Sequence, residues 1–424
     1  MKKLKVVVIG CGLRGMAYTN IMARDPEKYE VVAVAEPLPD RRRYMQEKHN
    51  IPDNMCFEDW PELMALGKIA DVAIISVMDR EHHKLAMKAI ELKYDLLLEK
   101  PVAPELPECV DIAKYAKEQG VKIMVCHVLR YAPVFVKIKE ILDSGELGDI
   151  VSINHEECVG DIHQSHSFVR GNWGNSKRSS TMLLQKSCHD IDLLSWLISK
   201  ECKQVQSFGN IAYFKKENAP EGSPEFCIDG CPQAETCPYN AVKLYLDKKE
   251  NDWFRPVSTG MIDPQDVDVE KALRTTNYGR CVFKCDNDVV DHQTVNMLFE
   301  DDVTVTFTMA AFNKGGRHIH VMCTKGELRA STDDSIIHTY NFVTKEDKDF
   351  DVNALSDSII NGHGGGDDGI VEALYSYFAL DKKLDNVTEI DVSLKSHILV
   401  FAAEESRLSG GKTVDLEEFK SRYL

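Results

Sequence analysis

Three side chains in this sequence have the chemistry to move a proton to or from a hydroxyl group. Lys100 comes two residues after the apolar run 96–98, and Lys186 and His189 lie three residues apart in the helical pattern 183–198. Residues three apart in a helix share one face, and a positioned ammonium or imidazole can exchange a proton with a reacting hydroxyl. We therefore predict that Lys100, His189 and Lys186 are catalytic. The alternatives are a surface lysine at a helix start and a histidine packed in the core.

A glycine-rich motif follows the first apolar run of the chain. Gly10, Gly12 and Gly15 form the pattern G-x-G-x-x-G after residues 4–9 and before a helical pattern. In a dinucleotide-binding fold these glycines allow a tight turn, a close approach of backbone to pyrophosphate, and packing of helix on strand. A chance glycine-rich turn is the alternative. We predict cofactor contacts from Gly10, Gly12, Leu13, Arg14 and Gly15.

The residue that selects the cofactor is Glu36, which ends the second apolar run 21 residues after Gly15. An acid at roughly this spacing, about 20 residues, binds the ribose 2′-OH of NAD, and it would repel the 2′-phosphate of NADP. Arg41, Arg42 and Arg43 could attract that phosphate, form a solvated face or stack on adenine. We expect NAD, with Glu36 and Arg41 at the adenosine end of the site.

Two polar segments are rich in groups that bind hydroxylated ligands. Residues 163–173 combine hydrogen-bond donors with aromatic rings, and residues 363–367 place three glycines before an aspartate and the helical pattern 369–380. Glycines let backbone lie close to a ligand, and the aspartate could bind hydroxyls or cap the helix. For the first segment, a polar surface loop is the alternative. We predict substrate contacts from His166, Arg170, Trp173, His363 and Asp367.

Five of the 13 cysteines fall within one polar stretch. Their spacings, C-x3-C-x5-C and C-x3-C, could hold a structural zinc ion, although they are wider than the common C-x2-C. Free, packed thiols are the alternative. The odd total, scattered along the chain, is not typical of a secreted disulfide framework and favours a reducing compartment. The zinc hypothesis concerns Cys227, Cys231, Cys237, Cys281 and Cys285.

Alternating strands and helices must position the glycine motif and Lys100. Continuous apolar runs separated by helical patterns indicate buried parallel strands with crossover helices. We therefore predict an α/β fold whose residues 1–130 form a Rossmann domain with a doubly wound parallel sheet. The apolar runs are 4–9, 31–35, 72–77, 96–98 and 123–125.

The remainder of the chain predicts a different architecture. Short strand patterns occur at 150–153, 205–208, 294–299 and 303–309, the last two in hairpin-like succession. We predict that residues 131–424 form a substrate-binding α+β domain on a large, mostly antiparallel sheet. The polar, cysteine-bearing stretch of about 215–287 is predicted to be an insertion lying over that sheet.

Composition excludes several classes of partner. Hydrophobic residues make up 43% and charged residues 28% of the chain, as in globular domains with a sizeable core. No window approaches the roughly 18 apolar residues of a membrane span, and the first apolar run is too short for a signal peptide. A net charge of −17 without a long basic run argues against nucleic acid. We expect a cytoplasmic protein that acts on a small molecule.

Several motifs together resemble the glucose–fructose oxidoreductase and inositol dehydrogenase (Gfo/Idh/MocA) family. They are Glu-Lys-Pro at 99–101, Asp-Arg-Glu-His at 79–82, Arg-Tyr at 130–131 and His-Asp-Ile-Asp at 189–192. The resemblance covers essentially the whole chain and implies that Lys100 contacts the reacting hydroxyl of a sugar or cyclitol. It also implies a homo-oligomer. The cofactor-binding residues that it adds are Asp79, His82, Glu99, Lys100 and Arg130.

One position departs from the family pattern. Simple dehydrogenases of the family usually carry aspartate four residues before the active-site histidine, and this chain has Gln185 there. The motif at 363–367 also looks like one in the NAD-dependent glycosidases of the family. We expect hydride transfer between nicotinamide and a ring hydroxyl carbon of a sugar, glycoside or cyclitol. The alternatives are a redox-neutral glycosidase acting by oxidation and elimination, and a non-catalytic NAD-binding regulator.

Overall fold

The computed structural model describes residues 2–247, 253–334, 336–352 and 365–424. Its N-terminal part contains six parallel strands in the order 3-2-1-4-5-6. The central strands are apolar and buried on both faces, as a doubly wound sheet requires. The predicted Rossmann architecture is therefore confirmed. The strands are β1 (Leu4–Ile9), β2 (Tyr29–Ala35), β3 (Cys56–Phe57), β4 (Val72–Ile75), β5 (Asp95–Leu98) and β6 (Ile123–Val125).

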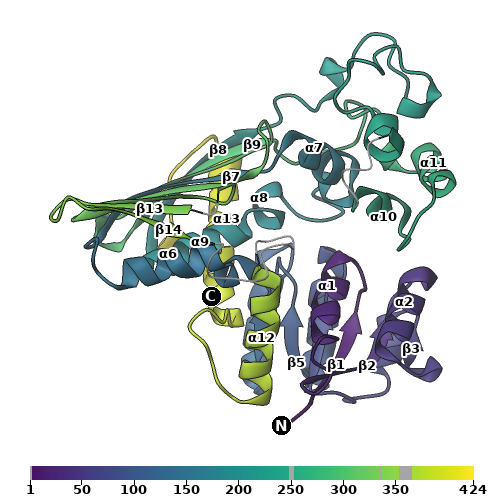
Figure 1. Ribbon diagram of the computed structural model, residues 1–424, viewed down its shortest axis with the longest axis horizontal. Helices are drawn as coiled ribbons and strands as arrows, with labels where there is room; N and C mark the ends of the chain where they lie inside the picture. Colours follow the sequence, from purple (N-terminus) through teal and green to yellow (C-terminus); the bar gives the residue numbers. More distant parts are fainter. Residues whose placement is uncertain (1, 248–252, 335, 353–364) are drawn as a thin grey trace.

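The strand order reverses between β1 and β4, which marks the edge where open α/β sheets bind ligands. The loops at that edge carry Gly10 after β1, Asp79 after β4 and Lys100 after β5. Crossover helices separate the strands, and Figure 1 shows α1 beside β1 at the centre of this domain. The helices are α1 (Leu13–Met22), α2 (Pro39–His49), α3 (Trp60–Met64), α4 (His82–Glu91) and α5 (Leu106–Gln119).

The second sheet has nine strands in the order 14-13-12-11-7-10-9-8-15, and only the pair β7–β10 is parallel. The predicted, mostly antiparallel sheet is thus confirmed. Burial alternates along β9 and β10, so one face of each strand packs on the core. The strands are β7 (Ile150–Cys158), β8 (Cys202–Asn210), β9 (His292–Phe299), β10 (Thr304–Ala310), β11 (Gly316–Cys323), β12 (Gly326–Ser331), β13 (Ile336–Asn341), β14 (Asp347–Asp351) and β15 (Val414–Asp415).

Helices join the two sheets. In Figure 1, α6 (Pro133–Asp143), α9 (Cys188–Ile198) and α13 (Ile390–Leu408) lie along one face of the second sheet. Helix α13 packs on both β8 and α5, so it bridges the domains. No helix in the described ranges is both long and apolar enough to cross a membrane. The short helices are α7 (Asp161–His163), α8 (Met182–Gln185) and α14 (Leu416–Lys420).

Helix α12 (Gly366–Ala379) comes from the C-terminal part of the sequence but packs against the first domain. Its buried side chains Ile370, Val371 and Leu374 share an apolar cluster with β1 and α1. Figure 1 shows it standing beside β5 and α1. The N-terminal end of α12 is thereby brought to the ligand-binding edge of the Rossmann sheet.

The insertion forms a small structure of its own. Its helices α10 (Phe254–Thr259) and α11 (Asp266–Thr275) pack on each other around a separate apolar cluster that includes Leu244 and Leu273. Figure 1 places α10 and α11 beyond one end of the second sheet, above α1 and α2, instead of over the face of the sheet as predicted. The insertion therefore approaches the nucleotide-binding domain.

Candidate active site

The glycine loop fits a dinucleotide. A Cβ added at Gly10 would lie 2.5 Å from the Ser76 carbonyl oxygen, and one at Gly15 would lie 2.3 Å from that of Gly10. At Gly12 the nearest atom would be Arg41 Nη1, 3.8 Å away. Packing within the protein thus requires the first and third glycines, whereas the open space at Gly12 is what a pyrophosphate needs. Helix α1 begins there without a side-chain cap, leaving N–H groups for phosphate.

Glu36 lies beside this loop. Its carboxylate accepts hydrogen bonds from Cys11 N at 2.6 Å and Leu38 N at 3.0 Å, and the residue is only 3% exposed. These contacts hold the acid between the glycine loop and the start of α2, where the ribose of the adenosine half would lie. Leu13, at the first position of α1, is 42% exposed and borders the same region.

Arg14, Glu99 and Asp367 form one cluster at the carboxyl edge of the sheet. Arg14 pairs with Glu99 at 3.1 Å and with both carboxylate oxygens of Asp367 at 2.6 and 3.0 Å. Burial opposes ionisation of Glu99, but Arg14 and Lys100 outweigh it and hold the pKa of Glu99 below its usual value. Asp367 was predicted to bind substrate or cap its helix, and the contacts described for it are those with Arg14. They tie α12 to α1.

Lys100 is held by Gln185. Lys100 Nζ donates to the Gln185 backbone oxygen at 2.6 Å and to its side-chain oxygen at 3.0 Å. The Gln185 amide nitrogen lies 3.4 Å from both carboxylate oxygens of Asp79, which also accepts from Ser179 Oγ at 2.5 Å. His82, in the same loop as Asp79, lies with its ring nitrogens 2.7 Å from Pro101 O and 3.1 Å from Val77 O. Asp79 and His82 therefore fix the loops around Lys100.

The predicted single helix 183–198 was wrong. Helix α8 ends at Gln185 and α9 begins at Cys188, because Ser187 has φ −102° and ψ 6°, outside the helical range. The break lets consecutive side chains face two sites. Gln185 reaches Lys100, whereas Lys186 turns to Glu157, with the two side chains 3.1 Å apart.

His189 belongs to a buried histidine group. Its ring lies 5.7 Å from that of His127, which in turn lies 5.9 Å from that of His397. Burial lowers the pKa of His127 to about 4. Asp192, on the same helix, binds Arg130 through two hydrogen bonds of 2.6 and 2.8 Å. Arg130 was predicted to bind cofactor, but this buried ion pair engages its guanidinium.

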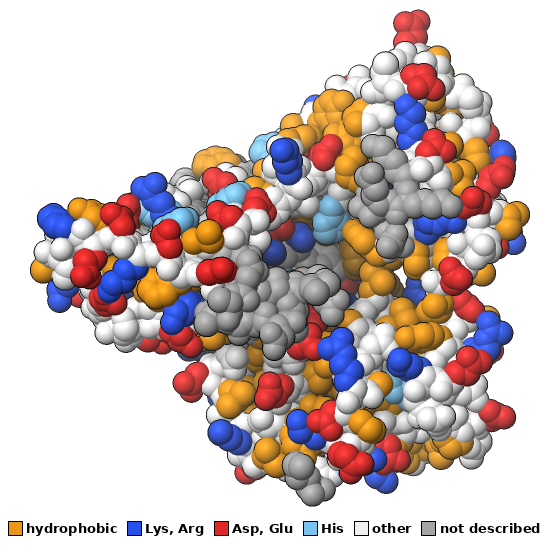
Figure 2. Space-filling view, in the orientation of Figure 1, with side chains coloured by type: hydrophobic (Ala, Val, Ile, Leu, Met, Phe, Trp, Pro, Cys, Tyr) orange, Lys and Arg blue, Asp and Glu red, His pale blue; other side chains and the backbone are white. Residues whose placement is uncertain are grey.

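A cavity of about 460 Å³ opens next to Lys186. Its polar wall contains Glu157, Lys186 and Arg317, and Arg317 Nη2 lies 2.5 Å from Glu157. Trp253 and Phe254 of the insertion supply an aromatic wall. Figure 2 shows the molecule hollowed between the sheet domain above and the nucleotide-binding domain below. Glu157, Arg317 and Trp253 are not among the site residues predicted from the sequence.

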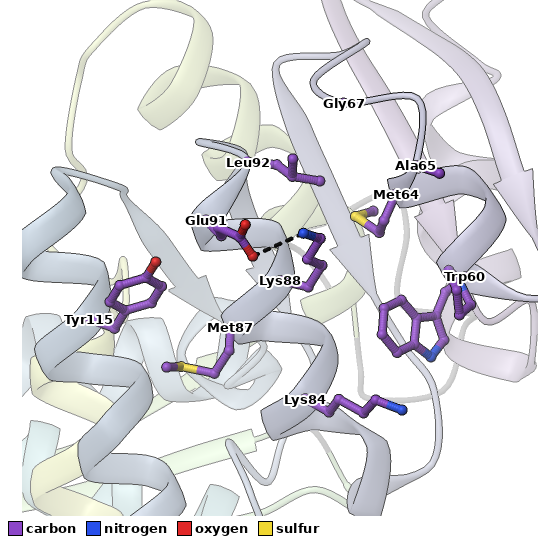
Figure 3. A pocket seen from close by; sticks show the side chains of 11 residues that line it. Trp60, Met64, Ala65, Gly67, Lys84, Met87, Lys88, Glu91, Leu92 and Tyr115 are labelled. Carbon is purple, nitrogen blue, oxygen red and sulfur yellow. Dashed lines mark hydrogen bonds and ion pairs between the residues drawn. The ribbon is translucent and has the colours of Figure 1, made fainter.

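A cavity of about 790 Å³ lies elsewhere, on the outer surface of the first domain. Figure 3 shows Trp60 and Met64 of α3 facing Lys84, Met87 and Lys88 of α4 across it. None of its lining residues belongs to the loops that follow β1, β4 and β5. We therefore do not assign the chemistry to this cavity.

Three predicted substrate contacts lie in packed surroundings. His166 is fully buried and stacks on Phe254 at 3.9 Å, and burial lowers its pKa to about 3. Arg170 is 1% exposed and donates to the carbonyl oxygens of Tyr239 and Arg280. Trp173 packs against the main core. These side chains hold the insertion in place, because the segment forms a buried π-helical turn instead of a loop. His363 lies outside the described residues.

The five insertion cysteines do not support the zinc hypothesis. Within the described ranges, no three histidine, cysteine or acidic side chains are arranged to hold a metal ion. Cys227 and Cys281 are buried in two different apolar clusters.

Family comparisons agree with this geometry. Residues 4–127 match the model described as "Oxidoreductase family, NAD-binding Rossmann fold", and residues 135–225 match the "GFO/IDH/MocA C-terminal domain". Among curated relatives, the putative oxidoreductase YteT of Bacillus subtilis is 25% identical over 55% of this chain and 56% of its own length. Inositol 2-dehydrogenase of Salmonella typhimurium is 24% identical over 51% of this chain and 59% of its own. The matches thus span little more than half of these relatives.

Solved structures extend the likeness to the whole fold. A levoglucosan dehydrogenase in complex with NADH and levoglucosan superposes with a TM-score of 0.71 at 15% identity, covering 98% of this chain and 100% of its own. An oxidoreductase from Agrobacterium radiobacter in complex with NAD+, L-tartaric acid and magnesium gives a TM-score of 0.70 at 15% identity, covering 98% and 99%. With the glycine loop, the two matched models and these folds together, the chain belongs to the Gfo/Idh/MocA family of NAD-binding oxidoreductases.

Proposed function

We propose that this protein oxidises or reduces a ring hydroxyl carbon of a sugar, glycoside or cyclitol. The observation that carries the proposal is the placement of Gln185 and Lys186. One side chain holds Lys100 at the carboxyl edge of the Rossmann sheet, and the next lines the 460 Å³ cavity. Lys100 itself is not part of the cavity wall, so the proposal requires that a ligand bound against Lys186 extends towards the Lys100 ammonium.

The chemistry of the cavity supports a polyhydroxylated ligand. Neighbouring hydroxyls each donate and accept hydrogen bonds, and the ion pairs of Glu157 with Lys186 and Arg317 offer acceptors and donors side by side. The face of Trp253 suits the apolar C–H groups of a sugar ring. A volume of about 460 Å³ lies within the roughly 300–1,000 Å³ of small-molecule sites. The inositol and levoglucosan named for two related proteins are compounds of this class.

Each residue has a distinct task in this proposal. NAD, held by the glycine loop and Glu36, would supply the acceptor or donor of the hydride. Lys100 Nζ binds the reacting hydroxyl and exchanges its proton, and Gln185 fixes the direction of that ammonium. His189 acts with Lys100 on the reacting hydroxyl, and Lys186 binds a neighbouring hydroxyl. Glu36 selects NAD over NADP by accepting a hydrogen bond from the ribose 2′-OH.

A redox-neutral glycosidase is the second candidate, and Gln185 favours it. An amide cannot take up a proton, so the usual dehydrogenase acid is replaced by a group that only positions Lys100. In the glycosidase, oxidation acidifies the C–H next to the new ketone, the glycosidic group leaves, water adds and the hydride returns. Loss of the carbon-bound proton then needs a base.

Incubation with NAD in deuterated water tests both candidates. We would offer free cyclitols, free sugars and glycosides, and follow NADH formation, aglycone release and deuterium incorporation next to the oxidised carbon. NADH from sugars or cyclitols supports the dehydrogenase, whereas aglycone release with deuterium and no net NADH supports the glycosidase. If no compound gives NADH, exchange or aglycone, a non-catalytic NAD-binding regulator replaces both.

A further inference from the structure

The insertion touches the nucleotide-binding domain at one defined place. Ile262 N, just after α10, donates a hydrogen bond of 2.8 Å to Asp40 Oδ2 at the start of α2. Gly260 lies so close to Leu38 that an added Cβ would be 3.0 Å from its side chain. Figure 1 shows the chain after α10 descending towards α2. Two segments more than 200 residues apart in the sequence thus meet across the cleft.

This contact lies at the adenosine end of the cofactor site. Leu38 and Asp40 follow Glu36, and Leu38 N is one of the two donors that hold the Glu36 carboxylate. The Arg41 guanidinium points back towards Gly12 of the phosphate loop. Its Nε is buried and has no hydrogen-bond partner within the described part of the chain. A guanidinium whose Nη1 lies beside the phosphate loop and whose Nε is unpartnered has donors that a bound nucleotide would satisfy.

The segment behind the contact is firmly anchored in the second domain. Phe254, at the start of α10, stacks on buried His166 with their rings parallel within 1°. Arg255 donates to Asp266 of α11 at 2.6 Å, which fixes α10 against α11. Residues 254–262 therefore cannot follow α2 if the two domains move apart, and opening the cleft here requires breaking the contact with Asp40.

We propose that residues 260–262, which we call the strap, form with Leu38 and Asp40 the outer wall of the adenosine half of the NAD site and slow the release of NAD. Release of the cofactor then needs the strap to open first. The strap concerns cofactor binding alone and does not rest on the proposed substrate.

The rate of NADH dissociation tests the role of the strap without any sugar substrate. NADH would be bound to the full-length protein and displaced by excess NAD in a stopped-flow fluorimeter. Asp40→Ala removes the acceptor for Ile262 N, and the double variant Leu38→Ala/Asp40→Ala also removes the apolar contact. Arg43→Ala is the matched control, because it removes the exposed partner of the same Asp40 carboxylate and leaves the strap contact intact.

We expect Asp40→Ala to speed NADH dissociation about tenfold, the double variant to speed it further, and Arg43→Ala to leave it within twofold of the parent protein. ADP-ribose, which is the adenosine half without nicotinamide, should reduce hydrogen exchange of the peptide 254–262 in the parent and less so in the double variant. The proposal is overturned if NADH dissociates at the same rate from all four proteins. It is also overturned if ADP-ribose does not change hydrogen exchange of the peptide 254–262 in the parent. If no sugar, glycoside or cyclitol proves to be a substrate, that result contradicts the proposed function and leaves the strap proposal unchanged.

Discussion

Lys100 Nζ donates hydrogen bonds to two oxygen atoms of one residue, the backbone and side-chain oxygens of Gln185, at 2.6 and 3.0 Å. An ammonium group has three N–H donors. The described parts of the chain contain no further acceptor for the third, which is left for a ligand. Because both oxygens are neutral, they direct the ammonium without adding the negative charge that an aspartate would bring.

The first prediction follows from this geometry. Lys100→Met should lower turnover by about 10²–10⁴-fold, the usual contribution of a positioned proton-transfer group. His189→Ala should lower it in the same range, because the proposed function places its ring at the reacting hydroxyl. NADH affinity, measured by fluorescence titration, should stay near that of the parent protein. Near-normal turnover in both variants would remove the assignment.

Gln185→Glu tests the positioning role. The new carboxylate lies at the Lys100 ammonium and favours its charged form, although nearby Asp79 repels the added charge. For substrate oxidation Lys100 must be an uncharged amine that can take up the hydroxyl proton. A carboxylate that stabilises the ammonium should therefore move the rising limb of the kcat against pH profile to higher pH by about 1–3 units. Gln185→Met, which has no side-chain oxygen, is the control and should lower kcat without this shift. A profile unchanged in Gln185→Glu contradicts the role.

Glu36 should set the cofactor preference. We expect the parent protein to bind NAD at least about tenfold more tightly than NADP, or ~1.4 kcal/mol. Glu36→Gln keeps an acceptor for Cys11 N but removes the charge, so most of the preference should disappear. Isothermal titration with both cofactors measures it. Equal binding of NAD and NADP by the parent would mean that Arg41 and its neighbours outweigh Glu36.

Lys186 should act on substrate binding. Lys186→Met removes one cation from the cavity and leaves Glu157 paired with Arg317. We expect KM for the best substrate of the panel to rise about tenfold, with NADH affinity unchanged. Lys200→Met is the matched control, since it removes a lysine paired with Asp301 outside this cavity. Equal KM values in the two variants would exclude Lys186 from the site.

The sequence predicts the fold well where hydrophobic periodicity is strong. The strand 123–125 begins and ends as predicted, but 205–208 extends to β8 (Cys202–Asn210) because pairing with β9 recruits polar residues that have no apolar signal. The helix break at Ser187 was missed, since a serine within an otherwise periodic segment does not distinguish a continuous helix from two.

The site is harder to predict because it depends on contacts distant in sequence. Gln185 is recognisable as a departure from the family pattern, but its bond to Lys100 joins residues 85 apart. The buried position of Glu157, in contrast, can be predicted from the sequence. A period of two from Ile153 puts His155 and Glu157 on the buried face of β7, and a buried acid is expected to have a partner. His166 was predicted to contact substrate because polar residue types dominate its segment, but pairing and stacking within the protein bury this segment.

The free energy of unfolding at acid pH should depend on buried histidines, His166 in particular. Burial lowers its pKa to about 3, well below the unfolded value of about 6.5. The folded protein therefore keeps His166 neutral while the unfolded chain takes up a proton, so the stability it contributes is lost as pH falls from about 6.5 towards 3. Between pH 7 and pH 5 this linkage amounts to about 2 kcal/mol of unfolding free energy.

His166→Phe isolates that contribution. Phenylalanine keeps the stacking on Phe254 but loses the hydrogen bond with Tyr245 Oη, so the variant should be less stable at pH 7. Its urea-derived unfolding free energy should nevertheless fall by about 2 kcal/mol less than that of the parent between pH 7 and pH 5. His318→Phe, which replaces a side chain that is 46% exposed, is the control and should follow the parent. If His166→Phe and the parent lose the same free energy over this range, protonation of His166 in the unfolded chain does not contribute to acid unfolding.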